Sequence, residues 1–378
     1  METFGVTRPV NASGISESLH FARACIRDVV PYPTERTPCE ADLSDNTNLF
    51  GAPPAARREL ANSGDEDIAR YPGLYTRRLR EALADYAGVR PDQLVTGCGS
   101  DDVIDSAVRA FAEPGELLAY SDPTFSMIPV FAKVNGLVPT PVPFTSLLDI
   151  DADALLTTNA RVIYVCSPNN PTGSLATRRA VDKVIEHAPG IVILDEAYGE
   201  FTDTGRISEG PAHERLLVTR TLSKAFGMAG FRIGYGTASA SLIHEIEKVR
   251  GPYKENAPGE RAAAAAVREN VDWMRATAAT AVSIRERFLS SLRAKGFQPY
   301  PSAANFILLP IDHAVRIAQL MRRQGIAVRP YPALRGIGDT IRITIGPWPV
   351  MERALDALVS ARDTVQQESD NVVSNEAT

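Results

Sequence analysis

Short apolar runs, each followed closely by polar residues, are the feature of this chain that most restricts its fold. Residues 162–166 and 190–194 are continuously apolar and rich in β-branched side chains, and residues 215–219 form a third candidate strand. Runs this short, without alternation of polar and apolar positions, are typical of strands covered on both faces, as in a parallel sheet. Helical patterns such as residues 77–87 alternate with the strands. The pattern predicts an α/β fold with a mostly parallel sheet flanked by helices.

Polar motifs follow these strands in a fixed order. Ser-Pro-Asn-Asn-Pro-Thr-Gly occupies residues 167–173, Asp-Glu-Ala-Tyr residues 195–198 and Arg-Thr-Leu-Ser-Lys residues 220–224, and Arg232 comes eight residues later. Open α/β sheets bind ligands at the ends of their strands, so we expect these motifs at one site. Together they match what pyridoxal 5'-phosphate needs: a lysine for its aldehyde, a carboxylate for its ring nitrogen, an amide and a phenol for its ring oxygen, and a hydroxyl and an arginine for its phosphate.

Lys224, Asp195 and Tyr198 are the predicted catalytic residues. Most lysines are solvated surface charges, but Lys224 lies between hydroxyl residues and a Gly-rich apolar run. Nearby cations and low polarity lower the pKa of a lysine, which favours condensation with an aldehyde. The freed amine can then carry a proton between substrate and cofactor. Asp195 ends an apolar strand, where it either joins a structural salt bridge or keeps the ring nitrogen protonated. Tyr198 either reaches the ring oxygen or fills the core.

Further residues complete the expected cofactor site. The Gly-rich turn before the helix at 101–111 presents N–H groups to a phosphate, although Ser100 or Asp101 could simply cap that helix. Phe125 could stack on the ring or belong to the core. The cofactor-binding residues predicted in this way are Gly99, Ser100, Asp101, Phe125, Asn170, Asp195, Tyr198, Thr221, Ser223, Lys224 and Arg232.

Arg342 interrupts an apolar strand pattern at residues 340–345. An arginine there is either buried in an ion pair or available to a ligand. We favour the second reading, because a guanidinium can hold the α-carboxylate of an amino acid through two parallel hydrogen bonds.

The length of 378 residues is typical of two domains. We divide the chain into an N-terminal arm at 1–44, a large cofactor-binding domain at 45–245, a smaller α+β domain at 246–364 and a flexible polar tail at 365–378.

Charge and cysteine usage exclude several classes of function. The net charge of −6 favours neither nucleic acid nor anionic membranes as partners, and no apolar run is long enough to span a membrane. The four cysteines and five histidines are scattered, which predicts neither a disulfide framework nor a metal site. Without a signal-like N-terminus, we expect a cytoplasmic protein that binds small molecules.

The motifs resemble those of the fold-type I pyridoxal-phosphate enzymes, specifically the class I/II aminotransferases, and most closely the histidinol-phosphate aminotransferases. The likeness runs over about residues 32–362 and includes Arg-Tyr-Pro at 70–72, Gly-Ser-Asp at 99–101 and Ile-Arg-Ile-Thr-Ile-Gly at 341–346. It implies an aspartate aminotransferase-like fold, pyridoxal 5'-phosphate as cofactor, and a homodimer with shared active sites in which Tyr71 reaches the cofactor phosphate of the neighbouring subunit.

The chain departs from this family on the substrate side. The family's Asn-Glu-Asn-Pro-Tyr-Gly reads Asn-Thr-Asn-Leu-Phe-Gly at 46–51, Gly-Pro-Trp-Pro at 346–349 replaces a polar stretch, and Phe125 stands where a tyrosine is usual. The substrate-binding residues implied by the resemblance are Tyr32, Asn48, Asn170, Arg329 and Arg342.

The expected reaction is transamination of an amino acid or amino-alcohol phosphate with 2-oxoglutarate, with L-histidinol phosphate as the first choice of substrate. One alternative is an aromatic or other biosynthetic amino acid. Another is a related decarboxylase, such as one acting on threonine phosphate, which would release carbon dioxide without an oxo acid. A non-catalytic regulator would need a DNA-binding module ahead of the domain, where only an arm of about forty residues is expected.

Overall fold

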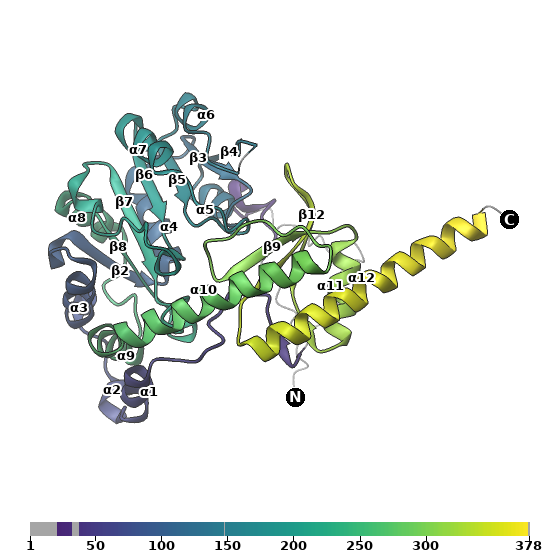
Figure 1. Ribbon diagram of the computed structural model, residues 1–378. Helices are drawn as coiled ribbons and strands as arrows, with labels where there is room; N and C mark the ends of the chain where they lie inside the picture. The colour runs from purple at the N-terminus through teal and green to yellow at the C-terminus, as the bar shows by residue number, and fades with distance from the viewer. Residues whose placement is uncertain (1–20, 32–37, 147, 377–378) are drawn as a thin grey trace, which may run out of the picture.

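A main sheet flanked by helices forms the larger part of the computed structural model (Figure 1), which describes residues 21–31, 38–146 and 148–376. Within these residues the sheet has seven strands in the order β2-β8-β7-β6-β5-β3-β4. They are β2 (Leu94–Cys98), β3 (Leu117–Asp122), β4 (Val138–Pro143), β5 (Val162–Cys166), β6 (Ile191–Asp195), β7 (Leu216–Thr221) and β8 (Ile233–Thr237).

The strands β4, β3, β5, β6 and β7 run parallel, and β8 is antiparallel to both β7 and β2. In the register of the sheet, Cys166 at the end of β5 pairs with Asp195 at the end of β6, and Asp195 pairs with Thr219 of β7. The predicted mostly parallel sheet is therefore confirmed, and the polar strand ends lie side by side.

Two hydrophobic cores cover the two faces of this sheet. Along β5, Ile163 and Val165 belong to one core, whereas Val162, Tyr164 and Cys166 belong to the other. Because successive side chains of a strand point to opposite faces, a strand between two cores must be apolar throughout. This explains the unbroken apolar runs of the sequence.

Helices supply the cover on both sides. The stripe of apolar residues at 77–87 forms α3 as expected, and this helix ends at Gly88, whose φ is 70°. The helix α9 packs against α1 and α3, so residues 257–269 lie beside the main sheet. From the sequence, the end of the large domain is instead expected at residue 245. The helices of this part are α1 (Pro54–Ala61), α2 (Asp65–Ala69), α3 (Arg77–Ala87), α4 (Ser100–Phe111), α5 (Ile128–Val134), α6 (Ala152–Thr157), α7 (Arg178–His187), α8 (Ala240–Val249) and α9 (Ala257–Glu269).

A small antiparallel sheet, in the order β11-β12-β9, forms the second part of the molecule. A separate short pair joins β10 to β1, so residues 41 and 42 of the predicted N-terminal arm are attached to this part. The elements are β1 (Ala41–Asp42), β9 (Phe306–Pro310), β10 (Ile326–Ala327), β11 (Arg329–Leu334), β12 (Gly338–Thr344), α10 (Val271–Ala294), α11 (Ala314–Arg323) and α12 (Trp348–Glu376). Short 3-10 turns occupy Ala24–Ile26, Leu74–Thr76, Pro91–Gln93, Gly199–Phe201, Gly210–Ala212 and Ala229–Phe231.

The last helix is longer than the sequence pattern predicts. Residues 365–378 were expected as a flexible polar tail, but α12 continues to Glu376 and extends away from the rest of the molecule (Figure 1). Val365 is buried, and Arg316 of α11 pairs with Glu368 at 2.5 Å. Once a helix is formed, each added residue closes one more backbone hydrogen bond, so polar composition alone does not end it. Among the described helices, none is both long enough and apolar enough to cross a bilayer.

Replacing Gly234 with alanine should destabilise the protein. A Cβ added there would lie 2.1 Å from the backbone nitrogen of Ser100 and 2.3 Å from the carbonyl carbon of Gly99, both of which are backbone atoms that must then shift. We expect a loss of about 1–3 kcal/mol, measured by thermal unfolding. Gly251→Ala is the control, because its added Cβ meets nothing within 4 Å. Equal melting temperatures for the two variants would contradict this account of the packing.

Candidate active site

A cavity of about 570 Å³ opens where the parallel strands of the main sheet end, next to β11 and β12 of the small sheet. It gathers most of the predicted site residues, although they come from distant parts of the chain. Those that line it are Ser100, Asp101, Phe125, Asn170, Asp195, Tyr198, Thr221, Ser223, Lys224, Arg232, Arg329 and Arg342.

Lys224 lies on the turn that follows β7, with its Nζ 3.3 Å from the carbonyl oxygen of Asp45 and 5.7 Å from the centre of the Tyr198 ring. Burial and the positive charge of Arg342 lower the pKa of Lys224 to about 8, against the opposing charges of Asp101 and Asp45. About a tenth of this amine is therefore unprotonated at pH 7, far more than for a free lysine, and the unprotonated form is the nucleophile that attacks an aldehyde.

Asp195 is a carboxylate that is only 3% exposed. Its Oδ1 accepts hydrogen bonds from the Ala197 N–H at 3.1 Å and from the Thr219 hydroxyl at 3.2 Å, and its Oδ2 accepts one from the Tyr164 hydroxyl at 2.6 Å. Burial raises the pKa of Asp195 to about 6, and the hydrogen bond from Tyr164 is the largest effect in the opposite direction. Among the described residues, no cation forms an ion pair with it.

The motifs around Asp195 and Lys224 are held together by a buried ion pair. Arg220 begins the lysine motif, and its Nη2 lies 2.8 Å from Oε2 of Glu196, the second residue of the aspartate motif. Breaking such a pair would leave an uncompensated buried charge, so the two strand-end turns stay in fixed relation.

The helix α4 begins beside Arg232. Gly99, its N-cap, has a φ of 81°, and a Cβ on it would lie 2.7 Å from Nη2 of Arg232. Arg232 also approaches Ser223, whose Oγ is 3.5 Å from Nη1 and accepts a hydrogen bond at 3.0 Å from the Thr221 hydroxyl. Free N–H groups at the start of α4, two hydroxyls and a guanidinium thus converge, which is the chemistry of a phosphate site.

Arg342 has no acidic partner within 4 Å among the described residues. Its Nη1 donates to Oδ1 of Asn170 at 2.6 Å, its Nη2 donates to the carbonyl oxygen of Ser44, and its Nε is buried without a hydrogen bond. In the register of the small sheet, Arg342 is directly opposite Arg329. Two arginines therefore border the cavity at adjacent strand positions, and the alternative of a structural ion pair for Arg342 does not apply.

Of the predicted residues that the structure describes, three do not line the cavity. Gly99 lies just behind Ser100, and Tyr32 falls outside the described residues. Asn48 holds the backbone instead: its amide donates to the carbonyl of Ala225 at 2.9 Å and accepts from the Phe50 N–H at 2.8 Å. Tyr71 is 80% exposed on the surface and stacks on Tyr253.

Other residues of the site escaped the sequence analysis. Tyr331 could have been found, because it follows Arg329 by two residues and a strand places both on one face. Asn46 begins the family-like segment at 46–51, but nothing in the sequence indicates that its amide donates to the distant Tyr198 hydroxyl at 2.9 Å. The further lining residues are Asp45, Thr47, Thr124, Ser126, Met127, Cys166, Ala197, Ala229 and Tyr331.

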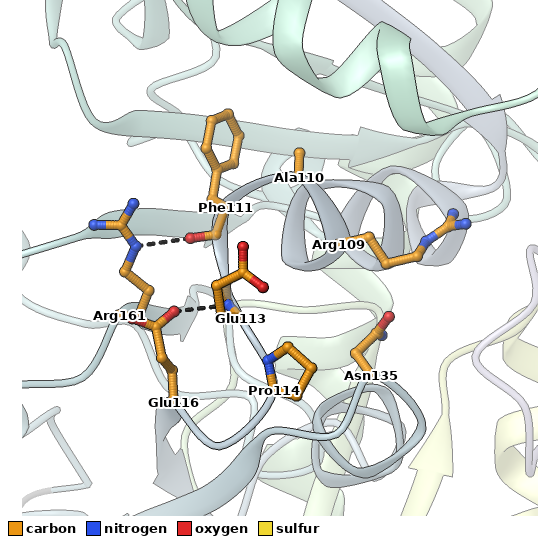
Figure 2. Close-up of a pocket in the computed structure, with 9 residues that line it drawn as sticks. Arg109, Ala110, Phe111, Glu113, Pro114, Glu116, Asn135 and Arg161 are labelled. Carbon is orange, nitrogen blue, oxygen red and sulfur yellow. Dashed lines mark hydrogen bonds between the residues drawn. The ribbon is translucent and has the colours of Figure 1, made fainter. Parts of the chain in front are cut away.

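A second hollow of about 360 Å³ lies at the end of α4, and Figure 2 shows its lining. Its cations are engaged by the protein, since Arg161 donates to the carbonyl of Phe111 at 2.7 Å and Arg109 pairs with Asp105 at 3.2 Å. None of the predicted site residues within the described ranges borders it. In the described part of the chain, no three His, Cys, Asp or Glu side chains are grouped so as to hold a metal ion.

Comparison with known proteins identifies the family. A sequence model of the family "Aminotransferase class I and II" matches residues 40–358. The chain belongs to the class I and II aminotransferases.

Individual relatives agree with this assignment. The chain is 32% identical to a histidinol-phosphate aminotransferase of Thermoanaerobacter pseudethanolicus over 86% of this chain and 94% of that protein. It is 36% identical to one of Roseiflexus castenholzii over 84% and 88%, respectively. The structure of a histidinol-phosphate aminotransferase from Sinorhizobium meliloti in complex with pyridoxal 5'-phosphate superposes with a TM-score of 0.81, at 25% identity, over 87% of this chain and 92% of that one. This aminotransferase therefore has the aspartate aminotransferase-like fold and uses pyridoxal 5'-phosphate.

The residues of the cavity fit that cofactor. Lys224 would hold the aldehyde carbon, Asp195 the ring nitrogen, and Asn170 with Tyr198 the ring oxygen. Ser223, Arg232 and the first amides of α4 would hold the phosphate. A buried carboxylate without a cation is costly, and a protonated ring nitrogen would supply the missing positive charge to Asp195.

Uptake of the cofactor should depend on pH through Lys224. Only the neutral amine attacks an aldehyde, so the rate of uptake by the apo-protein should rise with pH and level off above about 8, rather than continue to rise toward 10.5. The change in visible absorbance measures this rate. In Arg342→Gln the midpoint should move upward, because a positive charge that lowers the pKa of Lys224 is gone. A wild-type midpoint near that of free lysine would refute the role of burial.

Proposed function

We propose that this aminotransferase transfers the amino group of L-histidinol phosphate to 2-oxoglutarate. The observation that carries the proposal is the pair of arginines, Arg329 and Arg342, at directly opposed positions of β11 and β12 in the cavity that also holds Lys224. L-Histidinol phosphate carries a phosphate with about two negative charges, and 2-oxoglutarate carries two carboxylates. Paired guanidinium groups can bind either kind of anion. Histidinol phosphate has no α-carboxylate, so the arginines would bind its phosphate in one half-reaction and glutamate carboxylates in the other.

The side chains have separate tasks in this cycle. Arg342, held by Asn170 and the carbonyl of Ser44, would orient the substrate. Lys224 Nζ, freed from the aldehyde carbon by the substrate amine, would take the proton from the substrate α-carbon and deliver it to the cofactor carbon to which the substrate nitrogen is joined. Asp195 would remain anionic against the ring nitrogen. Bound pyridoxal phosphate supplies an acceptor for the electron pair that the proton leaves behind.

The departures from the family lie in the same cavity. Thr47 lines it where the family has a glutamate, and Phe125 lines it without the hydroxyl of the usual tyrosine. Both changes leave the groups around Asp195 and Lys224 in place, so they bear on the substrate side chain. If L-histidinol phosphate is not the donor, two alternatives remain for the tests below. One is an aromatic amino acid as donor, and the other is decarboxylation of a substrate such as threonine phosphate.

We also propose a homodimer in the cytoplasm. Tyr71 and Tyr253 stack with ring centres 4.7 Å apart on the surface, and Leu74 and Tyr75 beside them are exposed. Exposed apolar and aromatic groups of this kind are typical of subunit contacts. The four cysteines form no disulfide in the described residues, as a reducing compartment requires.

Substrate identity can be tested with single compounds. L-Histidinol phosphate alone should lower the visible absorbance of the purified holoenzyme, and phenylalanine and threonine phosphate should not. Turnover with 2-oxoglutarate should fall about 100- to 10,000-fold in Lys224→Ala, the range typical of a lost acid–base group. Lys248→Ala, an exposed lysine paired with Glu245, is the control and should keep wild-type turnover. Carbon dioxide release without an oxo acid would instead identify a decarboxylase.

Shared active sites can be tested by mixing two inactive variants. A dimer of Lys224→Ala with Tyr71→Ala would contain one site that has both native residues and one that has neither. Equal mixing with full subunit exchange should restore about a quarter of wild-type activity, since half of the dimers would carry one intact site of two. If Tyr71 belongs to the active site of its own subunit, the activity of the mixture should equal the average activity of the two variants.

A further inference from the structure

The carboxylate of Asp195 depends on hydrogen bonds rather than on an ion pair. Its three donors are the Tyr164 hydroxyl, the Thr219 hydroxyl and the Ala197 N–H. The bond from Tyr164, at 2.6 Å, is the shortest of the three, and it reaches Oδ2, the oxygen that neither of the other two donors contacts.

Packing alone does not explain why residue 164 is a tyrosine. It is 1% exposed in the middle of β5 and belongs to the same hydrophobic core as Val162 and Ile193. A phenylalanine would fill this space equally well, whereas a buried hydroxyl is costly unless it is hydrogen-bonded. Its hydroxyl donates to the carboxylate of Asp195 at 2.6 Å. Tyr164 does not line the cavity, so it can act on a ligand only through Asp195.

We propose that Tyr164 is a positioning residue, which holds the carboxylate of Asp195 ionised and turned toward the cofactor ring nitrogen. This inference rests on the role proposed above for Asp195. Held by Tyr164 on one oxygen and by Thr219 and Ala197 on the other, the carboxylate group cannot rotate without losing a bond. Its orientation is therefore fixed before any ligand enters.

Within the described ranges, the other titratable groups that face Asp195 give it no positive charge. Tyr164 and Cys166 lie on β5, Tyr198 follows β6, and Asp101 comes from α4. Burial raises the pKa of Tyr164, Cys166 and Tyr198, so all three stay neutral. Asp101 opposes ionisation of Asp195, as burial does. The Tyr164 hydroxyl is the largest contribution that favours the anion.

The test is the pH dependence of cofactor binding to the apo-protein. The dissociation constant of pyridoxal 5'-phosphate is measured between about pH 5.5 and 8.5 in wild type and in Tyr164→Phe. A protonated Asp195 must lose its proton before it can pair with a protonated ring, so affinity should rise with pH through the pKa of Asp195, about 6. In Tyr164→Phe this midpoint should rise by about one pH unit, which weakens binding about fivefold at the wild-type midpoint and about tenfold well below it.

Matched variants separate this effect from general damage. Tyr235→Phe removes another fully buried tyrosine hydroxyl of the same sheet, one without a hydrogen-bond partner, and should leave the midpoint unchanged. Thr219→Val removes the longer bond of 3.2 Å and should give a smaller shift than Tyr164→Phe. Thermal unfolding of each apo-protein confirms that the fold is intact.

Asp195→Asn distinguishes failure of this inference from failure of the proposed site. The pH-dependent step should vanish in this variant, and its persistence would overturn both the role of Asp195 and that of Tyr164. If the step vanishes but Tyr164→Phe keeps the wild-type midpoint, only the inference about Tyr164 falls. A shift in Tyr235→Phe as large as that in Tyr164→Phe would overturn it as well.

Discussion

The parallel pairing of β5, β6 and β7 is the constraint on which the rest of the structure depends. It places Cys166, Asp195 and Thr219 in one row, and the turns that follow these strands carry the asparagine, the tyrosine and the lysine of the site. Because both faces of the strands are buried, polar side chains meet a ligand only where the strands end. One sheet edge therefore fixes the relative positions of groups that are as much as 54 residues apart in the chain, from Asn170 to Lys224.

Within this frame, burial acts on two charges in complementary ways. It lowers the pKa of Lys224 to about 8 and raises that of Asp195 to about 6, so each group approaches the range in which it exchanges protons near neutrality. The protein limits the shift of Asp195 with hydrogen bonds and that of Lys224 with the carboxylates of Asp101 and Asp45. The protonation equilibria of Lys224 and Asp195 are thus set by the protein before the cofactor binds. Burying these two groups costs stability, which the surrounding core offsets.

Much of this could be predicted from the sequence, because local signals were strong. The apolar runs located β5 and β6 to within one residue, and the motifs after them supplied Asn170, Asp195 and Lys224. What escaped prediction depends on contacts between distant segments: Asn46 meets Tyr198 only through the fold. The last turns of α12 escaped because polar composition suggested a tail, and Tyr164 because one tyrosine in an apolar strand looks like any core residue.

The segment that leads from β1 to α1 joins the two parts of the molecule. Within it, the backbone N–H of Asn46 donates to the Thr344 hydroxyl and its carbonyl accepts from Asn305, both in the small part, while its side-chain amide donates to Tyr198 at the main sheet. A single residue thus ties the small sheet to the phenol of Tyr198. Any movement of one part against the other must carry that phenol along or break the hydrogen bond from Asn46 that holds it.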